Sequence, residues 1–172
     1  MAMDKNDVGR LSRATVFALL ILQPLFFYRR HLFQLTAHIP FDFAAFHFPL
    51  VAFIERSVKQ GAWPFWNPLE YCGVPIHADV QAQLYYPFTW IAILANQLTG
   101  GTRLLYWMQW LVPIHMIIGG IGAYFLLRQF RCSAWVALFG ATVFQIGPFF
   151  VSQAQHLGSI STAAWLDRKS VV

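Results

Sequence analysis

The chain has 172 residues, of which 58% are hydrophobic, 17% aromatic and only 11% charged. This composition is too apolar for an ordinary soluble domain and predicts a multi-pass membrane protein. The formal net charge is +5, but the basic residues are scattered in ones and twos and form no continuous basic face, which argues against a nucleic-acid partner. The anionic headgroups of a lipid bilayer are the simpler explanation for the positive charge.

Three apolar segments predict membrane spans. Residues 104–127 contain no charged side chain, which suffices for about 30 Å of hydrocarbon at about 1.5 Å per helical residue. Residues 133–153 are interrupted only by neutral polar residues and by Gly147 and Pro148. Residues 12–29 form a shorter first span, which we expect to stay uncleaved because arginines, not small residues, follow it. A fourth helix is expected from residue 157.

Basic residues predict the orientation of these spans, because cytoplasmic ends carry an excess of Lys and Arg. We therefore expect the N-terminus in the cytoplasm and the loop 30–103 outside. Arg29 and Arg30, where this loop begins, argue against an outer loop, but long loops translocate with little regard to charge. The predicted fold is therefore all-α, a polytopic membrane helix bundle with a cytoplasmic N-terminus and a long outer loop. The residues that mark the cytoplasmic ends are Lys5, Arg10, Arg13, Arg128 and Arg131.

The outer loop is expected to contain juxtamembrane amphipathic helices. Residues 49–60 begin with proline, carry an apolar stripe and are followed by Gly61, a pattern typical of a helix lying on the membrane. Glu55 and Lys59 are four apart in this helix and most simply form a solvated ion pair. Residues 86–99 supply only roughly three to four helical turns, so a crossing and an interfacial helix both remain open.

Asp42 is the only acid in an aromatic run that includes Phe41, Phe43 and Phe46. Burial near a bilayer raises the cost of its charge unless the group has a purpose, but a helix-capping aspartate is an equally good interpretation. Further along the loop, prolines and glycines alternate with aromatic side chains such as Trp66. This composition suits either a loop held in the headgroup layer or a pocket whose rings stack on sugars.

Short motifs follow one another in a fixed order along the chain. They are Asp42 ahead of the juxtamembrane helix, GAWPFWNP at 61–68, GVPIHADVQ at 73–81, YYP at 85–87, GIGAYFLLRQF at 120–130 and SQAQH at 152–156. Together they resemble the YfhO-like family of bacterial membrane proteins. The similarity covers nearly the whole chain, and the order of the motifs is far more specific than any one of them.

The resemblance implies a membrane glycosyltransferase of the GT-C class in the bacterial cytoplasmic membrane. Such an enzyme transfers a sugar from a polyprenyl-phosphate donor to a cell-envelope acceptor, with inversion, and Asp42 matches by position its catalytic carboxylate in the first outer loop. A carboxylate there accepts the proton of the acceptor hydroxyl, while cations stabilise the leaving phosphate. No metal ligands are predicted, and a divalent cation is left open. The residues expected to bind substrate are Asp79, Trp66, Asn67, His77, Gln81, Tyr85, Arg56 and Lys59, with Arg103 as a further cation.

Three further polar residues have more than one interpretation. Asp79 could bind the acceptor, orient the loop, assist a metal or cap a turn. His156 follows the third span on the outer side, where it could approach the loop or simply be solvated. His115 lies within a span, where it could titrate or donate a hydrogen bond between helices, and we expect the hydrogen bond.

The chain departs from the family in two ways. His47 stands where a glutamine or tyrosine is expected, which weakens a detailed transfer of roles. Family members also have many more spans, so we expect residues 1–172 to be the N-terminal part of a single multi-pass domain, inactive alone, with residues 167–172 (DRKSVV) a non-native tail.

Two other functions remain open beside the transferase. One is a transporter or lipid-handling protein that holds a headgroup without breaking bonds, for which Gly- or Pro-interrupted helices in two similar halves would be typical. The other is a non-catalytic protein whose aromatic loop docks a second membrane subunit.

Overall fold

The computed structural model describes residues 12–169. The fold is mostly helical, at 72% helix, with two short strands. The predicted helical class is confirmed at this level. The elements are α1 (Arg13–Phe27), α2 (Arg29–Leu32), the π-helical turn η1 (Phe43–His47), α3 (Phe48–Lys59), β1 (Trp66–Asn67), β2 (Val74–Pro75), the 3₁₀ turns η2 (Ile76–Ala78) and η3 (Val80–Ala82), α4 (Pro87–Leu98), α5 (Leu104–Gln129), α6 (Ala134–Ile146), α7 (Pro148–Ser152), the 3₁₀ turn η4 (Gln153–Gln155) and α8 (Leu157–Lys169).

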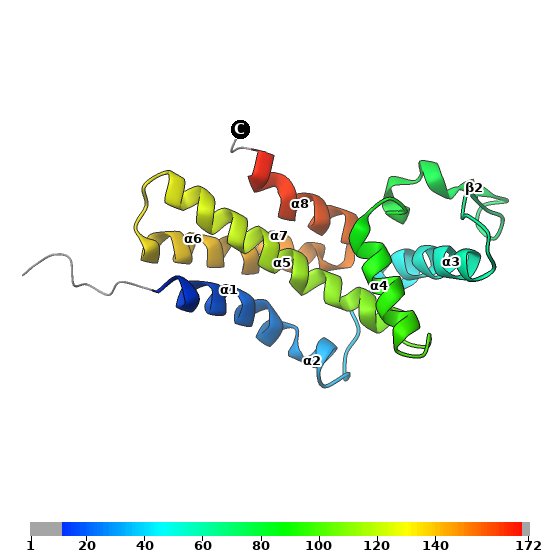
Figure 1. The fold of residues 1–172 in the computed structure, drawn as a ribbon, viewed down its shortest axis with the longest axis horizontal. Coiled ribbons are helices and arrows are strands. Elements are labelled where there is room, and N and C mark those ends of the chain that lie inside the picture. Colours follow the sequence, from blue (N-terminus) through cyan, green and yellow to red (C-terminus); the bar gives the residue numbers. More distant parts are fainter. Residues whose placement is uncertain (1–11, 170–172) are drawn as a thin grey trace, which may run out of the picture.

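Helix α5 is the axis around which the other helices pack. It contacts α1, α4, α6 and α8, and Figure 1 shows it running along most of the length of the molecule. Gly119 and Gly120 lie where its neighbours come closest: Gly119 faces Phe144 and Phe150, and Gly120 faces Gln145. Small residues therefore allow close helix packing here.

Within residues 12–169, two helical segments are, by length and composition, long and apolar enough to cross a membrane. They are α5 and the run Ala134–Gln155, which contains α6, α7 and η4. They coincide with the predicted spans 104–127 and 133–153. Gly147 and Pro148 divide the second run, because α6 ends before Gly147 and Pro148 begins α7. Helix α1 has 15 residues and is apolar but shorter than these two.

Helix α3 forms as predicted, but the protein covers its apolar face. Pro49 lies in its first turn, and Gly61 follows it with a φ of 73°. Leu50, Val51 and Ile54 are buried in the main hydrophobic core, together with residues of α4 and α5. The expectation that this face lies on the membrane is therefore wrong, because its apolar area is already removed from solvent inside the fold.

The Glu55–Lys59 ion pair also forms, at 2.9 Å, but it is not simply solvated. The Glu55 side chain is only 8% exposed. Asn96 of α4 is fully buried; its Nδ2 donates to Glu55 Oε1 at 2.8 Å, and its Oδ1 accepts from the backbone N–H of Arg103 at 2.8 Å. The glutamate was expected on a polar face, yet it belongs to a buried network that joins α3, α4 and the start of α5.

Tyr86 joins three parts of the chain just before α4. Its hydroxyl contacts Nε2 of His115 in α5 and accepts a hydrogen bond from Nε1 of Trp165 in α8 at 2.8 Å. His115 does bond to another element, but not as the predicted donor: its Nδ1 donates to the backbone carbonyl of Leu111 within α5, so its Nε2 accepts from the Tyr86 hydroxyl. Helix α4 itself has 12 residues, too few to cross about 30 Å of hydrocarbon.

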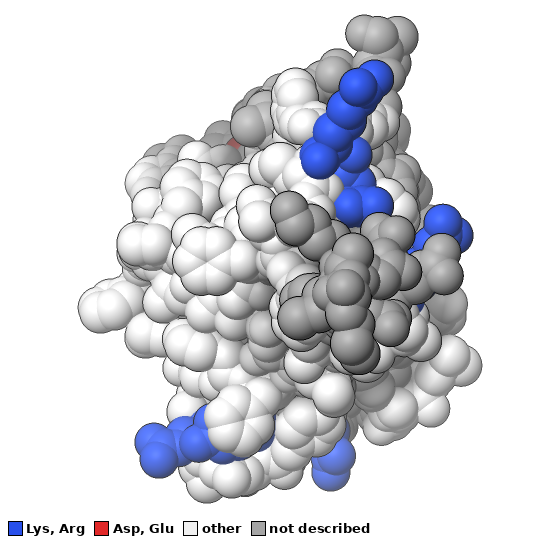
Figure 2. Space-filling view, turned by 90° about the vertical axis from the view of Figure 1, so that its left-hand side faces the viewer, with Lys and Arg blue, Asp and Glu red and all other residues white. Residues whose placement is uncertain are grey.

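The two ends of the molecule carry different features. Helix α1 begins and α5 turns into α6 at one end, whereas α3, α4 and the strands gather toward the other (Figure 1). Among the described residues, the charged side chains visible from the first end are almost all Lys or Arg (Figure 2). Of the residues expected to mark the cytoplasmic side, Lys5 and Arg10 lie outside the described residues, as does the last part of the expected tail, residues 170–172.

Candidate functional site

Asp42 lies at the entrance to the helical segment that continues into α3. It directly precedes the π-helical turn η1, yet its side chain makes no capping hydrogen bond there. Its Oδ2 lies 3.1 Å from Nε2 of His156, and the side chain is 55% exposed. Helix capping therefore does not account for Asp42, whose carboxylate is held at one oxygen by a histidine far away in sequence.

His156 follows η4 and directly precedes α8. Of its two interpretations, solvation and approach to the outer loop, the structure shows the second. Its Nδ1 is buried and has no hydrogen-bond partner among the described residues. The sequence could not decide between the two, because the contact depends on the path of the chain from α6 through α7 and η4 back to the loop.

His47 ends the π-helical turn and is 3% exposed. Burial lowers the pKa of its imidazole, and this outweighs the hydrogen bond to the backbone of Gln81 and the nearby carboxylates of Asp42 and Asp79, which raise it. The buried Nε2 of His47 has no partner within residues 12–169. π-helical turns are frequent at functional sites, and this one presents a neutral imidazole with an unfilled hydrogen-bonding position.

A cavity of about 670 Å³ lies between these loop residues and the start of α8. Its lining includes His47, Gln81, Gln83 and His156. Three of these carry buried polar atoms without a partner in the described part of the chain, namely His47 Nε2, Gln83 Oε1 and His156 Nδ1. A buried unpaired polar atom costs about 1–3 kcal/mol, so three such atoms in the residues that line one cavity make its wall unusually polar for a protein interior.

The arrangement combines a proton acceptor with hydrogen-bonding groups. Asp42 offers a carboxylate at the edge of the cavity through its contact with His156. Neutral imidazoles and side-chain amides both donate and accept hydrogen bonds, which suits hydroxyl-rich molecules. We call the cavity and Asp42 together the Asp42 site.

Three of the predicted substrate-binding residues line a neighbouring cavity of about 380 Å³. These are His77, Asp79 and Tyr85, and Gln83 lines both cavities, so the two adjoin. Asp79 also accepts a hydrogen bond from the backbone N–H of Gln81 at 2.8 Å and thereby caps η3. The capping interpretation of Asp79 therefore holds, whatever further role its second oxygen has.

Two further predicted residues, Trp66 and Asn67, form β1, which pairs antiparallel with β2. Asn67 is buried, and its Oδ1 accepts a hydrogen bond from the backbone N–H of Leu69 at 3.0 Å. Trp66 is exposed, and its ring lies so close to Gly73 that a Cβ there would overlap it. Asn67 thus shapes the loop, whereas Trp66 presents a free aromatic face.

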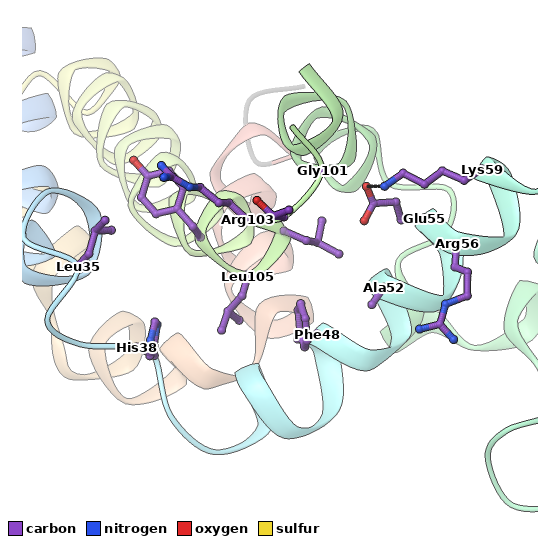
Figure 3. A pocket seen from close by; sticks show the side chains of 13 residues that line it. Leu35, His38, Phe48, Ala52, Glu55, Arg56, Lys59, Gly101, Arg103 and Leu105 are labelled. Atoms are coloured by element: carbon purple, nitrogen blue, oxygen red, sulfur yellow. Dashed lines mark ion pairs between the residues drawn. The ribbon is translucent and has the colours of Figure 1, made fainter. Parts of the chain in front are cut away.

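Arg56 and Lys59 lie elsewhere. Together with Arg103 they line a cavity of about 610 Å³ that shares no lining residue with the cavity at Asp42 (Figure 3). The structure therefore does not bring these cations to Asp42. We call this second place the cationic cavity. As to metals, no group of three or more His, Cys, Asp or Glu side chains within the described residues is placed to hold an ion.

The burial of His47 predicts a loss of stability in acid. The pKa of His47 in the folded state lies below the ordinary value of 6.5. At a pH between these two values, His47 is protonated in the unfolded chain but neutral in the folded chain. Stability is therefore full above about pH 6.5 and falls as the pH drops from there through the lowered folded pKa. Thermal melts between pH 8 and pH 4.5 should show a smaller acid loss for His47→Asn than for wild type. An equal loss would show that His47 does not titrate in this way.

Comparison with known proteins adds no relative: no family model matches the chain, and no match was found among curated proteins or solved structures.

Proposed function

We propose that this chain belongs to a membrane glycosyltransferase of the GT-C class, resembling the YfhO-like family. The parent enzyme would transfer a sugar from a polyprenyl phosphate to a cell-envelope acceptor. The observation that carries the proposal is the Asp42–His156 contact of 3.1 Å beside a cavity edged by unpaired polar atoms. A carboxylate next to a polar cavity is what general-base attack by a sugar hydroxyl requires.

In the proposed step the acceptor hydroxyl oxygen attacks the anomeric carbon of the donor sugar. Its proton passes to the carboxylate oxygen of Asp42 that His156 does not hold, while the bond between the anomeric carbon and the phosphate oxygen breaks and the lipid phosphate leaves with the electron pair. A single displacement inverts the configuration. His156 acts as a positioning residue, because it fixes the direction of the carboxylate.

The proposed location is the bacterial cytoplasmic membrane, with the Asp42 site on the outer side. Arg13 begins α1, and Arg128 and Arg131 lie at the α5–α6 turn, so these cations gather at one end of the helices (Figure 1). The positive-inside rule assigns this end to the cytoplasm. In this arrangement α5 and the run Ala134–Gln155 cross the bilayer, and α1 forms a third, shorter crossing.

The test is sugar transfer in membranes that contain the full-length protein. Labelled polyprenyl-phosphate sugars of several kinds are supplied in turn, and labelled cell-envelope product is measured against membranes without the protein. We expect transfer from one donor class, with the product linkage inverted. Failure of every donor at matched expression would contradict the proposal and favour a lipid-handling or interaction protein.

A further inference from the structure

A further cavity, of about 410 Å³, lies where α1 runs into α2 beside the end of α6. We call it the α1–α6 cavity. It shares no lining residue with the cavity at Asp42, with the cavity that adjoins it or with the cationic cavity. The proposed transfer step therefore does not explain its chemistry. Its lining consists of Gln23, Phe26, Phe27, Arg29, Arg30 and Ile146.

The two arginines bring positive charge that no acid in the described part of the chain neutralises. No Asp or Glu lines the α1–α6 cavity, and neither arginine has an ion-pair partner within residues 12–169. The Arg29 guanidinium is engaged locally: it donates to the backbone carbonyl of Phe26 at 3.0 Å, and its Cζ lies 4.3 Å from the centre of the Phe26 ring. The Arg30 side chain makes no such contact with the described residues, so its guanidinium is free to bind an anion.

Gln23 supplies a second free donor on the same side of the helix. It precedes Arg30 by seven residues, about two helical turns, and both residues line the cavity. Long helical side chains lean toward the N-terminus, which for Arg30 is the direction of Gln23. Gln145 Nε2 donates to Gln23 Oε1 at 3.1 Å and so orients the Gln23 amide, whose Nε2 has no hydrogen-bond partner among the described residues.

Helix α1 is too short to carry its two arginines clear of the hydrocarbon. In the proposed membrane placement its first residue faces the cytoplasm, and its 15 residues extend over about 22 Å of the roughly 30 Å of hydrocarbon. Arg29 and Arg30 thus lie at or below the level of the outer headgroups. A cation at this depth needs an anionic partner or must reach up to the headgroups, and a lipid phosphate provides that partner.

The apolar part of the lining is bare. Phe26 is 68% exposed and Phe27 is 45% exposed, so in a bilayer their rings lie against lipid tails. From the headgroup side inward, the helix therefore presents a guanidinium at Arg30, the two rings about one turn deeper and an amide donor at Gln23 about one turn deeper still. A ligand that suits this order has an anionic head, a hydrogen-bond acceptor nearer to its tails and an apolar chain.

We propose that the α1–α6 cavity binds an anionic glycerophospholipid from the surrounding bilayer. Arg30 binds the phosphate, the Gln23 amide donates to an ester carbonyl, which in such a lipid lies between the phosphate and the tails, and an acyl chain covers Phe26 and Phe27. Because Gln23 also accepts from Gln145 of α6, the lipid stabilises the contact between α1 and α6. The site rests on the proposed membrane placement of α1 but not on the proposed sugar transfer.

The experiment measures lipid retention by the purified full-length protein in neutral detergent, using native mass spectrometry. Phosphatidylglycerol is the probe. Diacylglycerol keeps the esters and lacks the phosphate, whereas ether-linked phosphatidylglycerol keeps the phosphate and lacks the ester carbonyls. We expect half-retention of phosphatidylglycerol at a concentration lower than that of diacylglycerol by about tenfold or more, and lower than that of the ether lipid by about threefold or more, since a hydrogen bond to a charged group is the stronger of the two.

Matched variants assign each contact. Arg30→Gln should raise the half-retention concentration by about tenfold or more, whereas Arg131→Gln removes one positive charge outside the cavity and should change it less than about twofold. Arg30→Lys keeps the charge and should retain the lipid even if the glutamine variant folds poorly. Gln23→Met should abolish the preference for the ester lipid over the ether lipid, while Gln145 keeps its bond to the carbonyl of Leu20.

Several results would overturn the proposal, and none of them depends on sugar transfer. They are equal effects of the two glutamine variants, loss of the lipid by the lysine variant, retention of diacylglycerol as strong as that of phosphatidylglycerol, and no preference of the wild type for ester over ether lipid. Displacement of phosphatidylglycerol by an equal concentration of a polyprenyl phosphate, which has no ester carbonyl, would also overturn it, in favour of a site for the donor lipid.

Discussion

Asp42→Asn is expected to reduce sugar transfer by at least about a hundredfold, because general-base catalysis contributes about 10²–10⁴-fold in rate. Asparagine keeps the shape of the side chain and can still bond to His156, which lies 3.1 Å from the Asp42 carboxylate. It cannot accept the proton of the attacking hydroxyl. The change should therefore lower the turnover rate and leave donor binding intact, which transfer assays and donor-binding assays on the same membranes will separate.

The control for this variant is Glu70→Gln, the same chemical change in the same loop. Glu70 lines none of the cavities that contain the predicted site residues, so transfer should stay within about twofold of wild type on the general rule that surface changes away from a site have small effects. Unchanged transfer by Asp42→Asn would remove Asp42 from the mechanism. Loss of donor binding by the same variant would show that Asp42 binds substrate and is not the base.

Local patterns along the chain predicted most of the helices. The uncharged stretch within α5 and the proline and glycine that bracket α3 act through near neighbours, so their structural consequences can be read directly. The face that α3 buries could not be predicted in this way. An amphipathic stripe fits a membrane surface and a protein core equally well, and only the positions of α4 and α5 decide between them.

The candidate site was less predictable than the fold. Asp42 stood out because an acid in an aromatic run is costly, but its partner His156 is brought to it by the return of the chain through η4. From the sequence, His47 is only a departure from the pattern of the family that the chain resembles. The structure places His47 at the end of a π-helical turn and buries it beside the cavity. Neither feature can be predicted from the spacing of residues in the sequence. Arg56 and Lys59 are polar residues of the same loop as Asp42, yet the fold directs them to another cavity.

Gly120→Ala is expected to lower the thermal stability of the protein, although alanine is the better helix former. An added Cβ would overlap the side-chain amide of Gln145, which is fully buried where α5 meets α6. Gln145 donates to the backbone carbonyl of Leu20 and to Gln23 Oε1, both at 3.1 Å, so its displacement also weakens the contact with α1. Overpacking costs about 1–3 kcal/mol, and a net loss of about 2 kcal/mol corresponds to a melting temperature lower by roughly 4–8 °C in detergent.

The cause can be isolated with two further variants. Gly158→Ala places a Cβ in α8 whose nearest neighbouring atom is Gln83 Nε2, at 3.9 Å, so it should leave the melting temperature unchanged or raise it through better helix propensity. Gly120→Ala/Gln145→Ala removes the overlapping amide, and its cost should fall below the sum of the two single costs by about 0.5–3 kcal/mol, the range for residues in direct contact. Strict additivity would show that Gly120 and Gln145 do not constrain each other, and that the α5–α6 contact tolerates a larger residue at this position.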